Sequence, residues 1–186
     1  MFSNVDQEIL KSLLVKYINE PELLKVLNEI IDSFQLEIPS KGIPLGNVTS
    51  QLFINIYLHE LDEFVKLKLK AKYYIRYADD FVILENDKSI LETYKVEIKK
   101  FLSDTLKFEL KAQNRQVQTL SSGVTFLGTT FFPKHRIISK SNKRRFYEKV
   151  CENNLHSYLG FLQHVHGFKL EEKLKWKVEE IVKNVV

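Results

Sequence analysis

Two neighbouring carboxylates interrupt an apolar stretch, "YIRYADDFVIL", at residues 74–84. The runs on each side of Asp79 and Asp80 are rich in β-branched and aromatic residues and are too short for two helices. The stretch therefore predicts a strand, a tight turn and a returning strand, with both acids at the turn. Strands that are apolar on both faces are covered on both faces, so we expect the acids to emerge at the end of a buried hairpin.

The composition fits one sizeable globular domain, or one domain with an appendage. The chain has 186 residues, of which 44% are hydrophobic and 28% charged. The single cysteine, Cys151, excludes an internal disulfide and fits a reducing compartment. No apolar run approaches the roughly 20 residues of a membrane span, and the first ten residues lack the layout of a signal peptide. We expect a cytoplasmic protein that does not use a membrane.

The spacing of apolar residues predicts an α+β chain with a helical tail. A first helix is expected after Asn4 as its cap, with Gln7 three residues later, and a second with Pro21 in its first turn. A loop should follow over residues 35–49. Further helices are expected at about Ser50–Lys70, Lys88–Leu106 and from Lys140 onward, and short strands at Phe108–Leu110, Gln116–Leu120 and Thr125–Phe132.

Basic residues are concentrated late in the chain, although the net charge is only +4. The segment "KHRIISKSNKRRFYEK", from Lys134 to Lys149, has seven lysines and arginines and one acid, Glu148. Two interpretations stay open on charge alone: a solvated helix face, or a track for a phosphate backbone. The nearby Cys151 and three histidines, His156, His164 and His166, fit no usual zinc spacing.

Adjacent aspartates in a turn have a structural and a chemical interpretation. Aspartate is common in turns because its side chain accepts hydrogen bonds from nearby amides. Two in a row between apolar strands also suit Mg²⁺, which prefers oxygen ligands and is usually held by one or two carboxylates plus substrate phosphates. A two-metal site, which can clamp both oxygens of a phosphoryl displacement, needs acids from more than one part of the chain.

The segment "KGIPLGNVTSQ", which begins at Lys41, has glycines before a predicted helix. Glycine permits close backbone approach, and a helix start offers free amides to an anion or a nucleotide. A turn followed by a cap explains the segment equally well. Gln51 is harder to explain structurally, because an amide in the first turn is suited to contact a sugar or a base edge.

Taken together, these stretches resemble reverse transcriptases. "YADD", Tyr77–Asp80, resembles the metal-binding turn of the polymerase palm, and "GIPLGNVTSQLFINIYLHELD" resembles the nucleotide-contacting motif that precedes it. "GVTFLGTTFF", Gly123–Phe132, resembles the strand motif that supports the primer end, while "NKRRF" and "SYLGFLQHVHG" resemble the helical thumb. The resemblance implies a right-hand palm, an antiparallel sheet with packed helices, over residues 1–138. A helical thumb over residues 139–186 follows, and the fingers are absent. A chance "YADD" in an unrelated fold would need four coincidences in order.

The resemblance implies an RNA-directed DNA polymerase that copies template RNA into cDNA by two-metal nucleotidyl transfer, in a bacterium, an archaeon or a phage. Its partners would be template RNA, a primer or cDNA, dNTPs and an accessory helical protein, with Mg²⁺ or Mn²⁺ as cofactor. The implied residues are Asp79 and Asp80 for catalysis and metal binding; Leu45, Gly46, Asn47, Gln51 and Tyr77 for the nucleotide; Lys41, Lys143, Arg144 and Arg145 for nucleic acid; and Phe126, Leu127 and Gly128 for primer support.

The loop before the long helix departs from the usual family pattern. Group II intron and retron enzymes read Q-G-x-x-x-S-P where this chain reads "LGNVTSQ", with Leu45 and Gln51 at the ends. That variant resembles the reverse transcriptases of diversity-generating retroelements, which copy RNA with errors at adenines. By this likeness Leu45 and Gln51 flank the incoming nucleotide and loosen its selection.

The family also uses a third carboxylate, which we expect to fall a few residues before Met1, together with the fingers. Asp6 is no substitute, because it matches a position where a capping or first-turn acid is expected. A truncated palm and thumb is therefore expected, inactive on its own. The alternative is a nucleic-acid-binding fragment with no polymerase activity, which holds RNA through the same sheet and basic helices.

Overall fold

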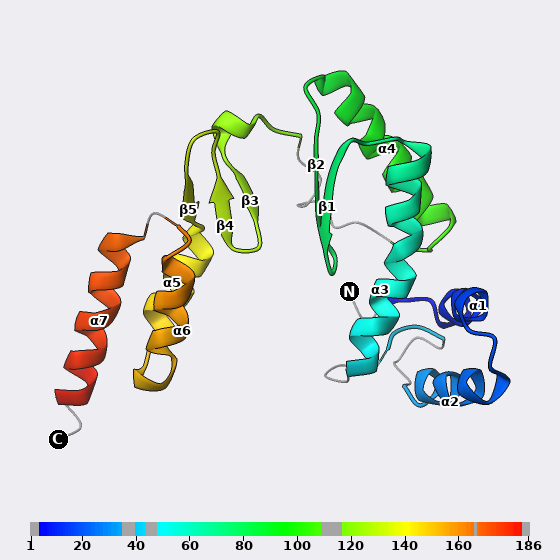
Figure 1. The fold of residues 1–186 in the computed structure, drawn as a ribbon, viewed down its shortest axis with the longest axis horizontal. Coiled ribbons are helices and arrows are strands. Elements are labelled where there is room, and N and C mark those ends of the chain that lie inside the picture. The colour runs from blue at the N-terminus through cyan, green and yellow to red at the C-terminus, as the bar shows by residue number, and fades with distance from the viewer. Residues whose placement is uncertain (1–3, 35–39, 44–47, 109–116, 166, 184–186) are drawn as a thin grey trace. The chain divides into compact units, whose positions relative to one another are not determined.

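The computed structural model describes residues 4–34, 40–43, 48–108, 117–165 and 167–183. The chain divides into two compact units, an N-terminal unit of residues 1–117 and a C-terminal unit of residues 118–186 (Figure 1). The N-terminal unit contains α1 (Gln7–Tyr17), α2 (Pro21–Asp32), α3 (Val48–Glu63), the π-helical turn η2 (Phe64–Lys68), β1 (Tyr73–Tyr77), β2 (Asp80–Leu84) and α4 (Lys88–Asp104). The C-terminal unit contains the 3₁₀ turn η4 (Leu120–Ser122), β3 (Val124–Phe126), β4 (Thr129–Phe131), β5 (Arg136–Ile138), α5 (Lys140–Lys149), α6 (Glu152–Leu162) and α7 (Phe168–Lys183).

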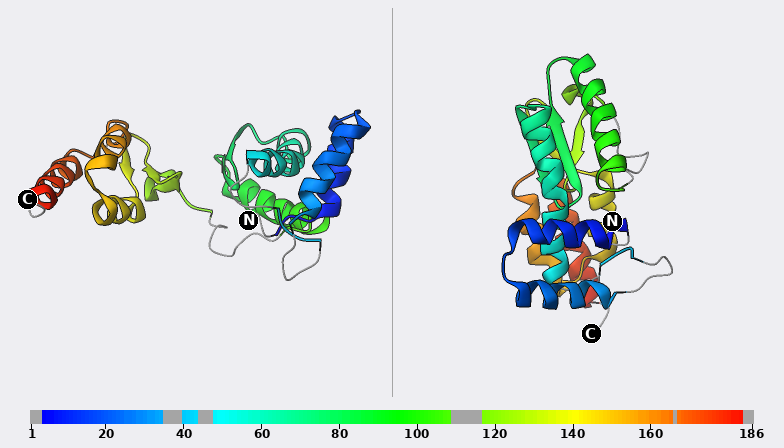
Figure 2. Two further views of the ribbon diagram at one scale, coloured as in Figure 1. Left: turned by 90° about the horizontal axis from the view of Figure 1, so that it is seen from below. Right: turned by 90° about the vertical axis from the view of Figure 1, so that its right-hand side faces the viewer.

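The core of the N-terminal unit forms where α1, α3 and α4 meet. Tyr57 of α3 is fully buried there. Its hydroxyl donates a hydrogen bond to the carbonyl of Leu106 at 2.5 Å and accepts one from the amide of Asp6 at 3.3 Å. Helices α1 and α2 pack on one another, as the right panel of Figure 2 shows. One buried side chain thus joins the start of α1 to α3 and to the end of α4.

The first helix begins later than the sequence predicts. Asp6, not Asn4, is the N-cap of α1: its backbone is extended and its carboxylate accepts a hydrogen bond from the amide of Ile9 at 3.1 Å. The prediction of Asn4 was wrong because Asp6 offers the same capping chemistry two residues closer to the first buried leucines. The capping role expected of Asp6 itself is confirmed. Pro21 in the first turn of α2 is also confirmed.

Strands β1 and β2 form an antiparallel hairpin in which Tyr74 faces Ile83 and Tyr77 faces Asp80. Tyr74, Phe81 and Ile83 all point to one face and pack on the core of α1, α3 and α4. The opposite face exposes more than half of the side chains of Tyr73, Ile75 and Tyr77. The expected cover on both faces is therefore wrong for the described residues, because the packing side chains of the hairpin all share one face.

The C-terminal unit is a three-stranded antiparallel sheet, in the order β3–β4–β5, followed by three helices. The strand predicted over Thr125–Phe132 is wrong as a single strand, because the chain reverses at Leu127 and Gly128 to form the β3–β4 hairpin. Within the predicted strand Gln116–Leu120, residues 117–119 have no regular structure and Leu120 begins η4. Most of Phe108–Leu110 falls outside the described residues. The helices predicted from Lys140 onward are confirmed.

The boundary between the two compact units lies between Val117 and Gln118, so strands β3, β4 and β5 belong to the same unit as the helices that follow them. The palm of residues 1–138 and the thumb of residues 139–186 are functional divisions and stay predictions. The architecture is a mostly helical α+β chain with small antiparallel sheets. Over the described ranges, no helix is long and apolar enough to cross a membrane.

Candidate active site

The two acids lie at a turn of minimal length. Tyr77 and Asp80 are the last paired residues of the β1–β2 hairpin, which leaves Ala78 and Asp79 as a two-residue loop. Ala78 has a φ of +52°. Two-residue hairpin loops need positive φ at the first central position, where glycine is usual, and an alanine there carries strain. Asp79 and Asp80 are both exposed, so the hairpin presents its carboxylates to solvent.

An arginine from β1 fixes this turn to α3. The Nη1 atom of Arg76 donates to the carbonyl of Ala78 at 2.9 Å and to Oδ1 of Asn55 at 3.2 Å. Its Nε and Nη2 atoms donate to the two carboxylate oxygens of Asp62 at 2.7 and 2.5 Å. The hydroxyl of Tyr74 donates to the same carboxylate at 2.6 Å. The strained turn is thus held by a chain of charged hydrogen bonds that ends on a helix.

Electrostatics favours the charged form of this pair. Burial alone would raise the pKa of Asp62, but hydrogen bonds from Arg76 and Tyr74 outweigh it, and the pKa lies below its ordinary value. The hydrogen bond to Asp62 raises the pKa of Arg76. The side chain of Arg76 is only 11% exposed and that of Asp62 only 25%. A bidentate pair this far from water is strong and strict in its geometry.

The two acids of the turn lie in different surroundings from Asp62. Partial burial raises the pKa of Asp80, and the neighbouring charge of Asp79 raises it further. Among the described residues, no lysine or arginine forms an ion pair with either acid. Uncompensated, adjacent and accessible carboxylates fit a hard divalent cation such as Mg²⁺ as part of its oxygen ligands. In the same described part of the chain, no three His, Cys, Asp or Glu side chains gather into a complete metal site.

Two of the predicted nucleotide-binding residues, Tyr77 and Gln51, lie within the described residues. Tyr77 lies directly across the hairpin from Asp80, on the same face, and is 65% exposed. Gln51 is exposed in the first turn of α3. Leu45, Gly46 and Asn47 lie outside the described residues. Lys41 is half-buried, and its backbone forms an isolated bridge with Asp6.

The residues predicted to support the primer form the second hairpin turn, in the C-terminal unit. Phe126 pairs with Thr129, and both loop residues have positive φ, +50° at Leu127 and +77° at Gly128. The carbonyl of Gly128 accepts hydrogen bonds from the amide of Ser139 at 3.0 Å and from Nδ2 of Asn142 at 3.3 Å. Ser139 also caps α5. This turn is therefore attached to the first residues of a helix.

The predicted basic residues Lys143, Arg144 and Arg145 are exposed on α5. Arg144 lies 3.5 Å from Glu148 one turn later. The guanidinium of Arg145 lies 5.6 Å from the ring centre of Phe146. Lys143 has no ion-pair partner in the described part of the unit. The segment "NKRRF" is thus a charged turn of α5 around the buried Phe146, and its first residue, Asn142, contacts the second hairpin.

Sequence reasoning missed the residues that position both turns. Asn55, Asp62 and Arg76 hold the first turn, and Ser139 and Asn142 hold the second. One signal was present, because Arg76 is the only charge within the apolar run "YYIRYA". A charge in a half-buried strand needs a partner, and Asp62 was one of three acids, with Glu60 and Glu63, on the preceding predicted helix.

Comparison with known proteins places these observations in a family. Residues 3–131 match the family described as reverse transcriptase (RNA-dependent DNA polymerase). The chain is similar to Protein YkfC of Escherichia coli strain K12, with 25% identity over 76% of this chain and 45% of that protein. It is also similar to the group II intron-encoded protein LtrA of Lactococcus lactis subsp. cremoris, with 24% identity over 68% of this chain and 32% of that protein.

The chain thus spans less than half the length of these curated relatives. The family match nevertheless contains the whole β1–β2 turn with its acids and the β3–β4 turn up to Phe131. It covers well over half of the chain, and it includes every element that positions Asp79 and Asp80. The chain belongs to the reverse transcriptase family.

Proposed function

We propose that this chain is the palm and thumb portion of an RNA-directed DNA polymerase, with the β1–β2 turn as its catalytic centre. The observation that supports this most is the pair Asp79 and Asp80, held at a fixed turn and lacking any protein counter-charge in the described residues. Adjacent carboxylates without a partner suit divalent metal ions and the phosphates of a nucleotide.

The Asp79 and Asp80 carboxylates would hold Mg²⁺, or Mn²⁺, and the metal would supply Lewis acidity at the transferred phosphoryl group. The protein's own contribution is placement. Arg76 fixes the carbonyl of Ala78 and so sets where the two carboxylates emerge. Tyr77, exposed beside Asp80, offers a flat surface to the sugar or base of a bound nucleotide. Gln51, with Leu45, Gly46 and Asn47, would contact the incoming dNTP.

The C-terminal unit would hold the primer and its template. Leu127 is 43% exposed at the tip of the second hairpin and, with Phe126 and Gly128, would support the primer end. Lys143, Arg144 and Arg145, together with Lys41, would contact phosphates. An accessory helical protein belongs to the same proposal. The likeness of "LGNVTSQ" to diversity-generating retroelement enzymes adds a finer placement, error-prone copying of a template RNA, which rests on that loop sequence.

Primer extension tests the proposal directly. The protein, in the length its gene encodes, is incubated with an RNA template, an annealed DNA primer and dNTPs in Mg²⁺ or Mn²⁺. We expect extension that disappears in Asp79→Asn and persists in the matched variant Asp104→Asn, whose acid lies at the end of α4. Unchanged extension by the Asp79→Asn protein would show that the turn is not the catalytic centre.

A second candidate is nucleic-acid binding without chemistry. The observation that favours it is the concentration of unpaired lysines on α5 and α7, which needs no metal to attract phosphate. This candidate predicts salt-sensitive RNA binding by the chain with no extension under any metal condition. Extension that depends on Asp79 would exclude it.

A further inference from the structure

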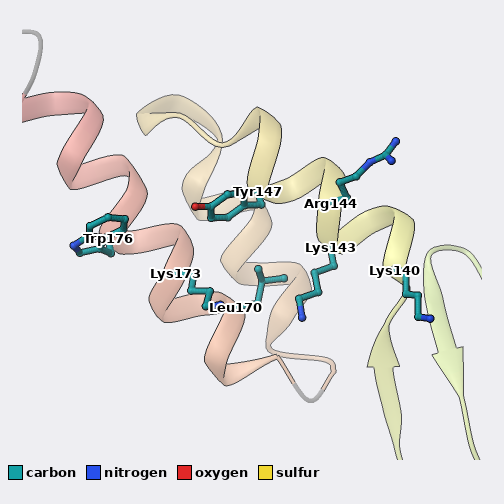
Figure 3. Close-up of a pocket in the computed structure, with 7 residues that line it drawn as sticks. All are labelled: Lys140, Lys143, Arg144, Tyr147, Leu170, Lys173 and Trp176. Carbon is teal, nitrogen blue, oxygen red and sulfur yellow. The ribbon is translucent and has the colours of Figure 1, made fainter.

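A groove runs between α5 and α7 in the C-terminal unit, with a volume of about 520 Å³. Figure 3 shows Tyr147 pointing from α5 toward α7, which carries Trp176, while Lys143 and Lys173 lie on either side of Leu170. Leu170 is buried and belongs to the core of this unit, so it forms the floor. The surface combines an apolar floor, two aromatic rings and several cations. We call it the α5–α7 groove.

The charge on the groove has one sign. Lys140, Lys143 and Lys173 line it, and none of the three forms an ion pair within the described residues. No acid of the described part of the chain lines the groove: Glu148 pairs with Arg144 at 3.5 Å, Glu171 pairs with Lys175 at 2.7 Å, and the exposed Glu172, next to Lys173 in sequence, is outside the lining. Arg144 also lines the groove, although its guanidinium points away from Leu170 in Figure 3. Unpaired lysines at one surface indicate a polyanionic ligand.

The aromatic rings make the ligand more specific. Trp176 is 59% exposed and Tyr147 is 42% exposed, both large fractions for such side chains. Lys177 lies 4.5 Å from the ring centre of Tyr147 and donates a hydrogen bond to its carbonyl, so this ring is held in place. Exposed aromatic rings beside cations bind nucleic acid by stacking on bases while the cations contact the backbone.

Only an unpaired nucleic-acid strand can contact the lysines with its phosphates and also stack its bases on the aromatic rings. In a duplex, the faces of the bases are stacked inside and are not available to a protein ring. A polyanion without bases can use the lysines but not the rings. A second hollow of about 530 Å³ shares Lys143 and Leu170 with the groove and reaches Phe168, which is 73% exposed. Phe168 and Trp176 are eight residues apart on α7, roughly 12 Å, the length of about three stacked bases.

We propose that the α5–α7 groove binds an unpaired nucleic-acid strand, with bases stacked on Trp176 and Tyr147 and phosphates contacting Lys143 and Lys173. This deepens the proposed function and rests on it, because template RNA is the unpaired strand that a reverse transcriptase supplies. It gives the C-terminal unit a single-stranded ligand in addition to the paired primer and template.

The chain carries its own probe of this site, because Trp176 is its only tryptophan. The test titrates the full chain at low salt with an eight-nucleotide oligoadenylate and follows tryptophan emission. We expect saturable quenching by the unpaired RNA. A blunt RNA duplex of the same length, and heparin as a polyanion without bases, should give little quenching. Equal quenching by the duplex or by heparin, or none by the unpaired RNA, would overturn the proposal.

Variants separate stacking from charge. With a labelled oligoadenylate and anisotropy as the readout, Trp176→Leu should weaken binding at least fivefold, whereas Trp176→Phe should retain it within about threefold. Lys173→Glu should weaken binding about tenfold. The matched control Lys149→Glu, an exposed lysine of α5 outside the groove, should change it less than twofold. Equal losses in Lys173→Glu and Lys149→Glu would mean that general charge attraction is enough.

The two proposals fail in different ways. A protein with both Asp79→Asn and Asp80→Asn should lose primer extension and still show normal quenching by oligoadenylate. Primer extension without any quenching by unpaired RNA would leave the polymerase assignment in place and remove the groove as its binding site. Quenching by unpaired RNA without any primer extension would keep the groove as a binding site for an unpaired strand and remove the polymerase assignment.

Discussion

The two hairpin turns of this chain both contain a non-glycine residue with a positive φ, but different interactions hold them in place. Each joins its strands through two residues, and each has a non-glycine residue at positive φ, Ala78 in the first and Leu127 in the second. Charged side chains hold the first turn, through Arg76 and Asp62 on α3. Uncharged groups hold the second, because the Gly128 carbonyl accepts hydrogen bonds from the amide of Ser139 and the side-chain amide of Asn142 at the start of α5.

The difference matches what each turn carries. The first presents two like charges, Asp79 and Asp80, which repel each other when no cation is bound, so a rigid support is needed to fix where the two carboxylates lie. The second presents an exposed leucine, Leu127, and needs only a fixed position relative to α5. A comparison of the two turns therefore separates the role of the metal-binding acids from the role of the interactions that hold a turn in place. Each of the following substitutions changes one of these two roles.

The largest expected effect is on activity at the first turn. Asp79→Asn should lower primer extension at least about 1,000-fold, because it removes a metal-binding charge whose loss affects the transition state directly. The measurement is the single-turnover extension rate with an RNA template. The matched change at the second turn, Leu127→Ala, should lower the rate about tenfold at most and leave Mn²⁺ affinity unchanged. A Leu127→Ala protein as defective as Asp79→Asn would remove the distinction between the turns.

Gly128→Ala should cause the largest loss of stability among these changes. A Cβ added at Gly128 would lie 1.8 Å from Nδ2 of Asn142, and the φ of +77° disfavours any side chain. Together, left-handed strain and the displaced Asn142 hydrogen bond should lower the free energy of unfolding of the C-terminal unit by about 2–3 kcal/mol. Urea unfolding followed by circular dichroism measures this loss.

A double variant shows how much of that loss is steric. Gly128→Ala with Asn142→Ala removes the overlap but keeps the backbone strain, so we expect the two changes to be less than additive by about 1 kcal/mol. Full additivity would mean that Asn142 moves aside at no cost, and the turn would then depend on glycine for its φ alone.

Asp62→Asn should destabilise the N-terminal unit by about 2 kcal/mol, because Arg76 is left buried with a weaker partner. Glu63→Gln is the matched control, since Glu63 is half-exposed and its only described ion-pair neighbour is His59 at 3.9 Å. The control should change the free energy of unfolding by less than about 0.5 kcal/mol. Comparable losses in both variants would mean that the Arg76 pair adds no more than an exposed ion pair.

The pH dependence of stability gives an independent check on the same pair. The pKa of Asp62 is lowered in the folded chain, so its contribution is complete above its unfolded pKa, about 4, and is lost as the pH falls through the lower folded value. Stability below pH 4 should therefore decline less steeply in Asp62→Asn than in the parent. Parallel pH profiles for the two proteins would show that Asp62 does not titrate with folding.

A structural feature of this molecule can be predicted from the sequence when the interactions that form it join residues close together in the chain. The β1–β2 hairpin and the long helix before it follow from local patterns, because periodicity and turn chemistry act within a few residues. The β3–β4 turn was missed because Leu127 gives no turn signal and only Gly128 does. The pair Asp62–Arg76 joins residues that are distant in the chain, so no spacing rule reveals it. The exposed face of Tyr73 and Ile75 depends on which segments pack on the hairpin, and apolar content alone does not decide that.

Ala78→Gly is expected to have the smallest effect, and it is the only one of these changes that should raise the free energy of unfolding. Glycine adopts a φ of +52° without the Cβ penalty that alanine incurs, while it increases the entropy of the unfolded chain, so the two contributions partly cancel. We expect the free energy of unfolding to rise by about 0.5 kcal/mol. If Arg76 holds the turn, primer extension should stay within about threefold of the parent, because its hydrogen bond to the residue 78 carbonyl does not need the alanine side chain. A large loss of extension in this more stable variant would show that alanine itself restricts the turn, and that the Arg76 support is insufficient without it.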